Sequence, residues 1–196
     1  MPKLIYSMGV SLDGYIAGPD GTFEWSAPDE ELHRFHNEQA AGVGLELYGR
    51  RLYEVMRTWQ TRGDEPDAPE VAREFARIWK ATPKVVFSTT LDAVEGNARL
   101  ARDDPAEEIA RLKAQDGKDI AVAGAGLAAT FIRLDEVDEY RPLVFPVVVG
   151  GRHAVPPPAR GAPRARARRD ADVRVARRVP ALRAGARLTR DRRTFC

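Results

Sequence analysis

Three short stretches of the sequence combine residue types that bind phosphate groups. The first, Gly124-Ala125-Gly126-Leu127, lies where a buried strand is expected to turn into a helix. Glycine lets a ligand approach the backbone closely, and the free N–H groups and positive dipole end of a starting helix favour an anion. The alternative is that these glycines only permit a tight turn, because the stretch is not the six-residue dinucleotide fingerprint.

Gly49-Arg50-Arg51 and Ser88-Thr89-Thr90 follow two other expected strands. Guanidinium groups match phosphate oxygens with paired hydrogen bonds, and hydroxyl groups with backbone N–H groups can hold a further phosphate. Taken alone, the arginines are better explained as solvated surface residues, and the hydroxyl residues are a weak signal because Ser and Thr are common at strand ends. Taken with the glycines, they predict one crevice that holds a dinucleotide carrying a ribose phosphate.

The segment from Ser11 to Gly21 contains three glycines and one proline in eleven residues. This composition predicts a mobile loop that can cover a bound ligand, the alternative being an ordinary connection. Further on, Glu31, His33 and His36 lie within two turns of an expected helix. No further strong ligand lies nearby in the sequence, so a metal site is not expected there.

The elements that must position these residues alternate between strands and helices. Apolar, β-prone runs predict strands at 4–10, 43–48, 84–89, 120–123 and 143–149. Helix start signals lie at Ser26–Asp29, Asp67–Glu70, Asp104 and after Gly124–Gly126, and a shorter helix is expected through Leu52 and Met56. Nearly continuous apolar strands are typical of sheets covered by helices on both faces. The pattern therefore predicts an α/β fold with a largely parallel sheet, in which ligands bind beyond the carboxyl ends of the strands.

The charges of the chain divide near residue 151. The 196 residues carry a formal net charge of +2, but residues 1–150 hold 17 Lys and Arg against 26 Asp and Glu, whereas residues 151–196 hold 14 Arg against three Asp. We therefore expect a domain over 1–151 and a poorly structured or weakly paired Arg/Ala/Pro-rich tail over 152–196. A shifted reading frame in GC-rich coding DNA removes Lys and Glu together, and is one hypothesis for the origin of this tail.

The composition of the chain also limits the cellular compartment and the partners that we expect for the protein. Cys196 is the only cysteine, which excludes an internal disulfide and a cysteine-based zinc site. No apolar run reaches the roughly 18 residues of a membrane helix, and no signal sequence is apparent. We expect a cytoplasmic protein without a membrane partner. Nucleic acid is at most a non-specific ligand of the basic tail, because aromatic residues do not interleave with its arginines.

The motifs, in their order along the chain, resemble the dihydrofolate reductase superfamily. The branch they resemble most is the reductase domain of the bifunctional riboflavin-biosynthesis deaminase-reductase and its stand-alone bacterial relatives. The resemblance covers about residues 3–151 and rests on residues 11–17, 47–54, 85–90, 123–127 and 137–151. It departs from the family after Gly151, where a β-hairpin that completes the sheet would be expected.

The resemblance implies a three-layer α/β/α fold and an NADPH-dependent reductase that transfers a hydride to a C=N bond of a pyrimidine- or pterin-like molecule, in a homodimer. It implies Gly49, Arg50, Arg51, Ser88 and Thr89 near the ribose phosphate, Gly124, Gly126 and Leu127 at the pyrophosphate, and Ile16, Ala17 and Gly18 at the nicotinamide.

The resemblance also points to two carboxylates on the substrate side. Glu31, or its neighbour Glu30, would correspond to the acid on the first helix of dihydrofolate reductases, although the helix dipole alone explains acids there. Asp13 would lie where the substrate enters, against the alternative of a turn-forming aspartate. Dihydrofolate reductase proper and a non-catalytic nucleotide-binding or interaction module on the same fold remain the competing functions.

Overall fold

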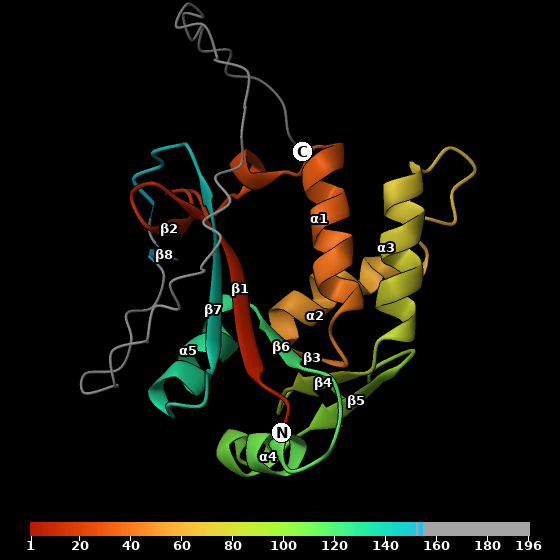
Figure 1. Ribbon diagram of the computed structural model, residues 1–196, viewed down its shortest axis with the longest axis vertical. Helices are drawn as coiled ribbons and strands as arrows, with labels where there is room; N and C mark the ends of the chain where they lie inside the picture. The colour runs from red at the N-terminus through yellow and green to blue at the C-terminus, as the bar shows by residue number, and fades with distance from the viewer. Residues whose placement is uncertain (152, 155–196) are drawn as a thin grey trace, which may run out of the picture.

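The structure, a computed structural model, describes residues 1–151 and 153–154 (Figure 1). The strands are β1 (Leu4–Ser11), β2 (Tyr15–Ala17), β3 (Leu45–Gly49), β4 (Lys84–Phe87), β5 (Ala98–Ala101), β6 (Ile120–Ala123), β7 (Glu139–Phe145) and β8 (His153–Ala154). The helices are α1 (Glu30–Ala41), α2 (Arg50–Met56), α3 (Glu70–Ala81), α4 (Pro105–Lys113) and α5 (Ala125–Arg133), with short 3-10 turns at Glu24–Ser26 and Arg57–Gln60.

Six strands form one sheet in the order β5-β4-β3-β6-β1-β7, and every neighbouring pair is parallel. In Figure 1, α1, α2 and α3 lie on one side of the sheet and α4 and α5 on the other. The predicted three-layer α/β fold is therefore confirmed. A second, two-stranded sheet pairs β2 with β8 in antiparallel fashion.

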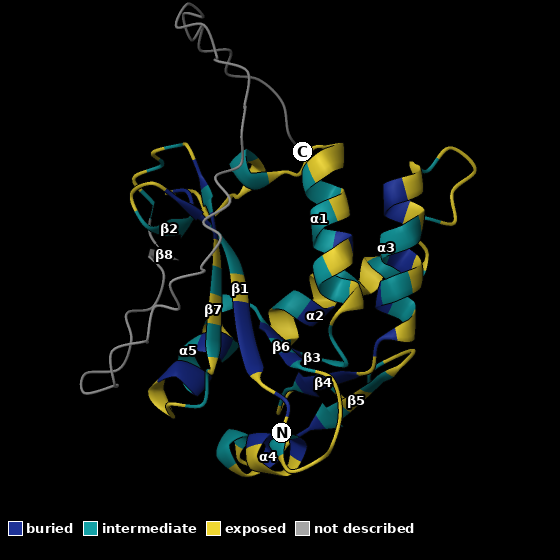
Figure 2. Ribbon diagram, viewed as in Figure 1, coloured by how far each residue is buried: buried dark blue, intermediate teal, exposed yellow. Residues whose placement is uncertain are grey.

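The central strands are buried on both faces, which explains their continuous apolar sequences. Leu47 and Val85 belong to the core under α4 and α5, whereas the next residues in each strand, Tyr48 and Val86, belong to the core under α2 and α3. Figure 2 shows buried residues along these strands and exposed residues on the outer sides of the helices. Successive side chains of a strand point to opposite faces, so both cores draw on the same strands.

Several predicted boundaries were wrong, and the reasons differ. The last strand runs over Glu139–Phe145 rather than 143–149, because an edge strand with an open face carries alternating polar residues. β5 was not predicted at all, since its four residues include an exposed arginine. The first helix is capped by Asp29, whose Oδ1 accepts from the Leu32 N–H at 2.8 Å, and not by Ser26.

The region after residue 151 is described only in part. His153–Ala154 pairs with β2, so regular pairing extends into the segment predicted to be a tail. The other positions of that segment lie outside the described residues.

A buried polar network joins α3 to the sheet. The Tyr48 hydroxyl donates to Glu46 Oε2 at 2.6 Å and accepts from Trp79 Nε1 at 3.1 Å, while Lys84 Nζ donates to the Trp79 carbonyl. Burial raises the pKa of Tyr48 well above its usual value and also raises the pKa of Glu46. Because α3 is amphipathic but has no side-chain cap, this network helps to fix its position.

Replacing Tyr48 with phenylalanine should therefore destabilise the fold. The substitution leaves Trp79 Nε1 and Glu46 without partners in a buried place, which costs about 1–3 kcal/mol of unfolding free energy. The loss is measured by comparing the unfolding free energies of the variant and the parent protein in urea. Tyr6→Phe is the matched control, since the hydroxyl of buried Tyr6 makes no hydrogen bond within the described residues; equal effects of the two changes would contradict the role of the network.

Candidate active site

The sheet order brings the predicted phosphate-binding stretches to neighbouring positions. β4, β3 and β6 are adjacent and parallel, so Ser88, Gly49 and Gly124 all follow the carboxyl ends of adjoining strands. A Cβ built on Gly49 would lie 3.8 Å from Leu127 Cβ, and one on Gly124 would lie 3.3 Å from Leu52 Cδ2. The starts of α2 and α5 therefore touch each other, as a shared crevice requires.

The start of α5 offers backbone donors and open space. Gly124 has a φ of +88°, which an L side chain would strain, and it precedes the first helical residue. A Cβ on Gly126 would meet nothing within 4 Å. No side chain caps α5, whereas Asp29 and Asp104 cap α1 and α4. The first N–H groups of α5 are thus available to an anion, and the residues fit a pyrophosphate.

The cationic and hydroxyl residues lie beside this helix start. Arg50 and Arg51 are exposed in the first turn of α2, and Arg50 forms a loose ion pair with Glu54 at 3.7 Å. Ser88 Oγ accepts hydrogen bonds from the N–H groups of Thr90 at 3.2 Å and Leu91 at 3.0 Å. The serine oxygen thus holds a turn at the end of β4, a structural task that the sequence did not reveal.

The loop after β1 packs against the segment that follows β7. Ala17 is buried and pairs with β8, and a Cβ on Gly151 would lie only 1.8 Å from the Ala17 carbonyl oxygen. Gly18 is also buried, and Ile16 is half-buried. A glycine is therefore required at position 151, where two backbones meet. The three residues predicted to border the nicotinamide form the inner side of this packed loop.

Asp13 links the same two segments. Its Oδ1 accepts from Ser11 Oγ at 2.6 Å and from the Val149 N–H at 3.2 Å, and its Oδ2 accepts from the Gly150 N–H at 2.8 Å. The Ser11 hydroxyl, followed by the two backbone N–H groups, lowers the pKa of the carboxyl group. The carboxylate thus already bonds to the protein's own donors.

Glu31 lies elsewhere, on the exposed first turn of α1. A hollow of about 480 Å³ adjoins this part of the helix and is lined by Glu30, Glu31, Arg34, Phe35 and Glu38. Glu31, Phe35 and Gln39 follow at intervals of four along one side of α1. Gln39 Oε1 accepts from Arg141 Nη1 at 2.8 Å, so this side of the helix faces β7. No hydrogen bond joins Asp13 to Glu31 within the described residues.

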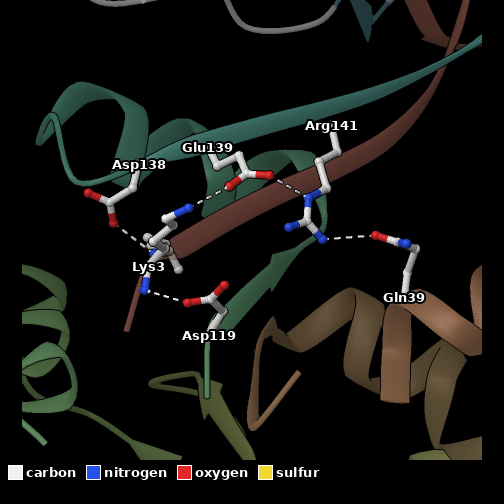
Figure 3. Close-up of polar contacts among 7 residues, drawn as sticks. Lys3, Gln39, Asp119, Asp138, Glu139 and Arg141 are labelled. Atoms are coloured by element: carbon white, nitrogen blue, oxygen red, sulfur yellow. Dashed lines mark hydrogen bonds and ion pairs between the residues drawn. The ribbon is translucent and has the colours of Figure 1, made fainter. Parts of the chain in front are cut away.

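Two arginines with structural hydrogen bonds were missed from the sequence, and of these only Arg102 lies at the carboxyl edge of the sheet. Arg141 lies on β7, where its Nε donates to Glu139 Oε1 at 2.7 Å; Glu139 also pairs with Lys3, as Figure 3 shows. Arg102 directly follows β5 and donates to the turn after β4. Both lie on or directly after edge strands, and the polar residues of β5 and of the first half of β7 kept these segments from being predicted as strands.

The described residues show neither a metal site nor a membrane-spanning helix. No three His, Cys, Asp or Glu side chains come together as a metal site, and His33 instead packs against the rings of Trp59 and Phe75. None of the helices described is long and apolar enough to cross a membrane. A second hollow, of about 460 Å³, lies at the amino ends of β3 and β4, away from the glycine and arginine stretches.

Comparison with known proteins identifies the family to which the chain belongs. The family model of the RibD C-terminal domain matches residues 2–177, and the chain belongs to this family. Among curated relatives, the uncharacterized Bacillus subtilis proteins YyaP and YwjB are 33% identical over 151 residues and 29% identical over 156 residues. The alignments cover 76% of this chain in both cases, and 77% and 79% of the two relatives.

Solved structures agree on the fold. A protein assigned to riboflavin biosynthesis from Shewanella sp. PV-4 superposes with a TM-score of 0.59 at 23% identity, over 78% of this chain and 82% of that one. A deaminase/5-amino-6-(5-phosphoribosylamino)uracil reductase from Thermotoga maritima superposes with a TM-score of 0.53 at 18% identity, over 79% of this chain and 47% of that one. The resemblance inferred from the motifs is thereby confirmed, and family membership supports a reductase-like role.

Asp13→Asn should loosen the junction between the loop after β1 and residues 149–150. The amide lacks one of the two acceptor oxygens, so the Val149 and Gly150 N–H groups should exchange with solvent faster and the melting temperature should fall at pH 7. Because the folded pKa of Asp13 is lowered, its stabilisation is present above the ordinary aspartate pKa of about 3.9 and is lost as the pH falls through the folded value.

The difference in melting temperature between parent and variant should therefore shrink as the solution is acidified below that range. Asp116→Asn, on an exposed loop, serves as the control. A variant as stable as the parent at pH 7, with unchanged amide exchange, would show that Asp13 does not hold the two segments together.

Proposed function

We propose that the protein is an NADPH-dependent reductase that acts on a C=N bond of a pyrimidine- or pterin-like small molecule. One observation carries the proposal. Neighbouring parallel strands end in an arginine pair, a hydroxyl-bearing turn and an uncapped glycine-rich helix start, and the arginine and glycine stretches are in contact. This set matches the successive phosphate groups of NADPH, and family membership supports the reductase class.

Each stretch has its own part of the cofactor to hold. Arg50 and Arg51, with Ser88 and Thr89, are assigned to the ribose phosphate, because their donors lie at adjoining strand ends. Gly124, Gly126 and Leu127 are assigned to the pyrophosphate, where backbone N–H groups are free and a side chain is absent. Ile16, Ala17 and Gly18 are assigned to the nicotinamide, which they would shield from water.

When bound, NADPH supplies a hydride to the carbon of the C=N bond, and the nitrogen gains a proton. The chain's contribution is to align donor and acceptor and to guide that proton. Glu31 is assigned to the proton transfer, because its carboxylate is exposed on the α1 side that faces β7 and can exchange protons with water. Asp13 is assigned a place beside the substrate entrance, where it keeps the loop after β1 in position.

The cysteine content supports a proposal for the compartment in which the protein works. A single cysteine suits a reducing compartment, and we place the protein in the cytoplasm. We further propose a homodimer, which size-exclusion chromatography with light scattering would test.

A non-catalytic nucleotide-binding module on the same fold would bind NADPH without oxidising it in the presence of candidate pyrimidines and pterins.

NADPH should bind more tightly than NADH. Two charge-assisted hydrogen bonds to the additional phosphate correspond to an affinity ratio of about ten- to a hundredfold. Fluorescence titration with both nucleotides measures this ratio, and Arg50→Ala/Arg51→Ala should bring it close to one. Arg57→Ala, at an exposed arginine beyond the other end of α2, should leave it unchanged. Equal affinities in the parent protein would overturn the assignment of the ribose phosphate.

Gly126→Val should abolish dinucleotide binding without unfolding the protein. The new side chain projects into space that the protein leaves open, so it meets the ligand rather than the fold. Circular dichroism should remain as in the parent while titration with either nucleotide shows no binding. Gly117→Val is the matched control, because a Cβ there also meets nothing within 4 Å. Normal binding by the Gly126 variant would reduce the glycine pair to a simple turn.

A further inference from the structure

Arg102 reaches from one strand end to the turn at the end of its neighbour. β5 pairs in parallel with β4, with Ala101 opposite Phe87, so Arg102 and Ser88 are the first residues beyond the two strands. Arg102 Nη2 donates to the Leu91 carbonyl at 2.6 Å, and its Nη1 lies 3.4 Å from the Thr89 carbonyl. One guanidinium group therefore bridges two carbonyl groups of the same turn.

The turn from Ser88 to Leu91 is consequently held from two sides. Ser88 Oγ accepts the N–H groups of Thr90 and Leu91, while Arg102 takes the carbonyl groups of Thr89 and Leu91. Within the described residues, the Thr89 N–H donates to no group. An exposed backbone N–H next to hydroxyl groups, in a turn that cannot easily rearrange, is a prepared set of donors for an anion.

The charge of Arg102 is not neutralised by a carboxylate of the described residues. The arginines nearest to it in sequence behave differently, since Arg99 pairs with buried Glu108, and Arg111 pairs with Asp103 and Glu108. Arg102 instead bonds only to neutral carbonyl groups and keeps its full charge at the carboxyl edge of the sheet. That edge is where Arg50 and Arg51 lie, two strands further along the sheet.

We propose that Arg102 is a positioning residue for the ribose phosphate and that, by fixing the Ser88–Leu91 turn, it sets the preference for a 2′-phosphorylated nucleotide. This inference rests on the proposed NADPH site and adds to it a third arginine, from a strand that contributes nothing else to the site. A plain surface tether would give the turn stability but would not distinguish between nucleotides with and without the phosphate.

Two small probes isolate the phosphate. Adenosine 2′,5′-bisphosphate and adenosine 5′-monophosphate differ only by the 2′-phosphate, and isothermal titration gives both affinities. Arg102→Met should lower the affinity ratio of the two probes about tenfold, mainly through weaker binding of the bisphosphate. Arg102→Lys keeps the charge but cannot bridge two carbonyl groups, so it should recover less than half of the loss. Arg77→Met, which removes an exposed arginine from α3, should leave the ratio unchanged.

Three results would overturn the proposal. They are a parent-like ratio in Arg102→Met, an equal loss of affinity for both probes, and full recovery in Arg102→Lys, which would reduce the residue to its charge. Amide exchange of Thr90 and Leu91, measured without nucleotide, tests the turn itself and should be faster in Arg102→Met than in the parent or in Arg77→Met. If the parent shows no preference for the bisphosphate while this exchange responds as expected, the proposed NADPH site fails and Arg102 is only a tether.

Discussion

The parallel pairing of the six-stranded sheet is the constraint on which the rest of the structure depends. Because all six strands run the same way, every strand-to-helix connection with unusual chemistry emerges at one edge. The order β4-β3-β6-β1 then decides which connections become neighbours: the hydroxyl turn, the arginine pair, the glycine-rich helix start and the loop after β1. Residues that are far apart along the chain thus lie next to one another at the edge where we propose the site.

Stability and binding are assigned to different parts of the molecule. The two apolar cores and the Tyr48–Trp79 hydrogen bond are buried between the sheet and the helices, with half-buried Glu46 beside them. The helix α5, by contrast, starts without a side-chain cap and beside an open glycine, at the edge where a ligand would bind. The first N–H groups of α5 have no hydrogen-bond acceptor within the helix or from a side-chain cap. An anion can be that acceptor, so this helix start is well suited to bind an anion.

The charges divide the site into two halves. Arg50 and Arg51 follow β3 and Arg102 follows β5, whereas the exposed first turn of α1 carries Glu30 and Glu31. The first half suits the phosphates of a dinucleotide, and the second would repel them. Under the proposed function, a dinucleotide would therefore bind with its phosphates away from α1 and its reactive ring toward the loop after β1.

The sequence by itself determined the layer architecture of this protein and singled out the three stretches that we propose bind phosphate. Apolar runs bounded by glycine and proline identify strands buried on both faces, and capping and turn residues act over a few positions of the chain, so both are visible locally. Only the tertiary structure decided the partners: that Asp13 bonds to Val149 and Gly150, that Gly151 must lack a side chain beside Ala17, and that Arg102 braces the turn after β4. These contacts join segments up to 137 positions apart. The edge strand β5 and the first half of β7 carry polar residues, so the apolar pattern did not predict them. Their geometry arises when the sheet forms, because strand order and register are properties of pairing between distant segments rather than of any one segment.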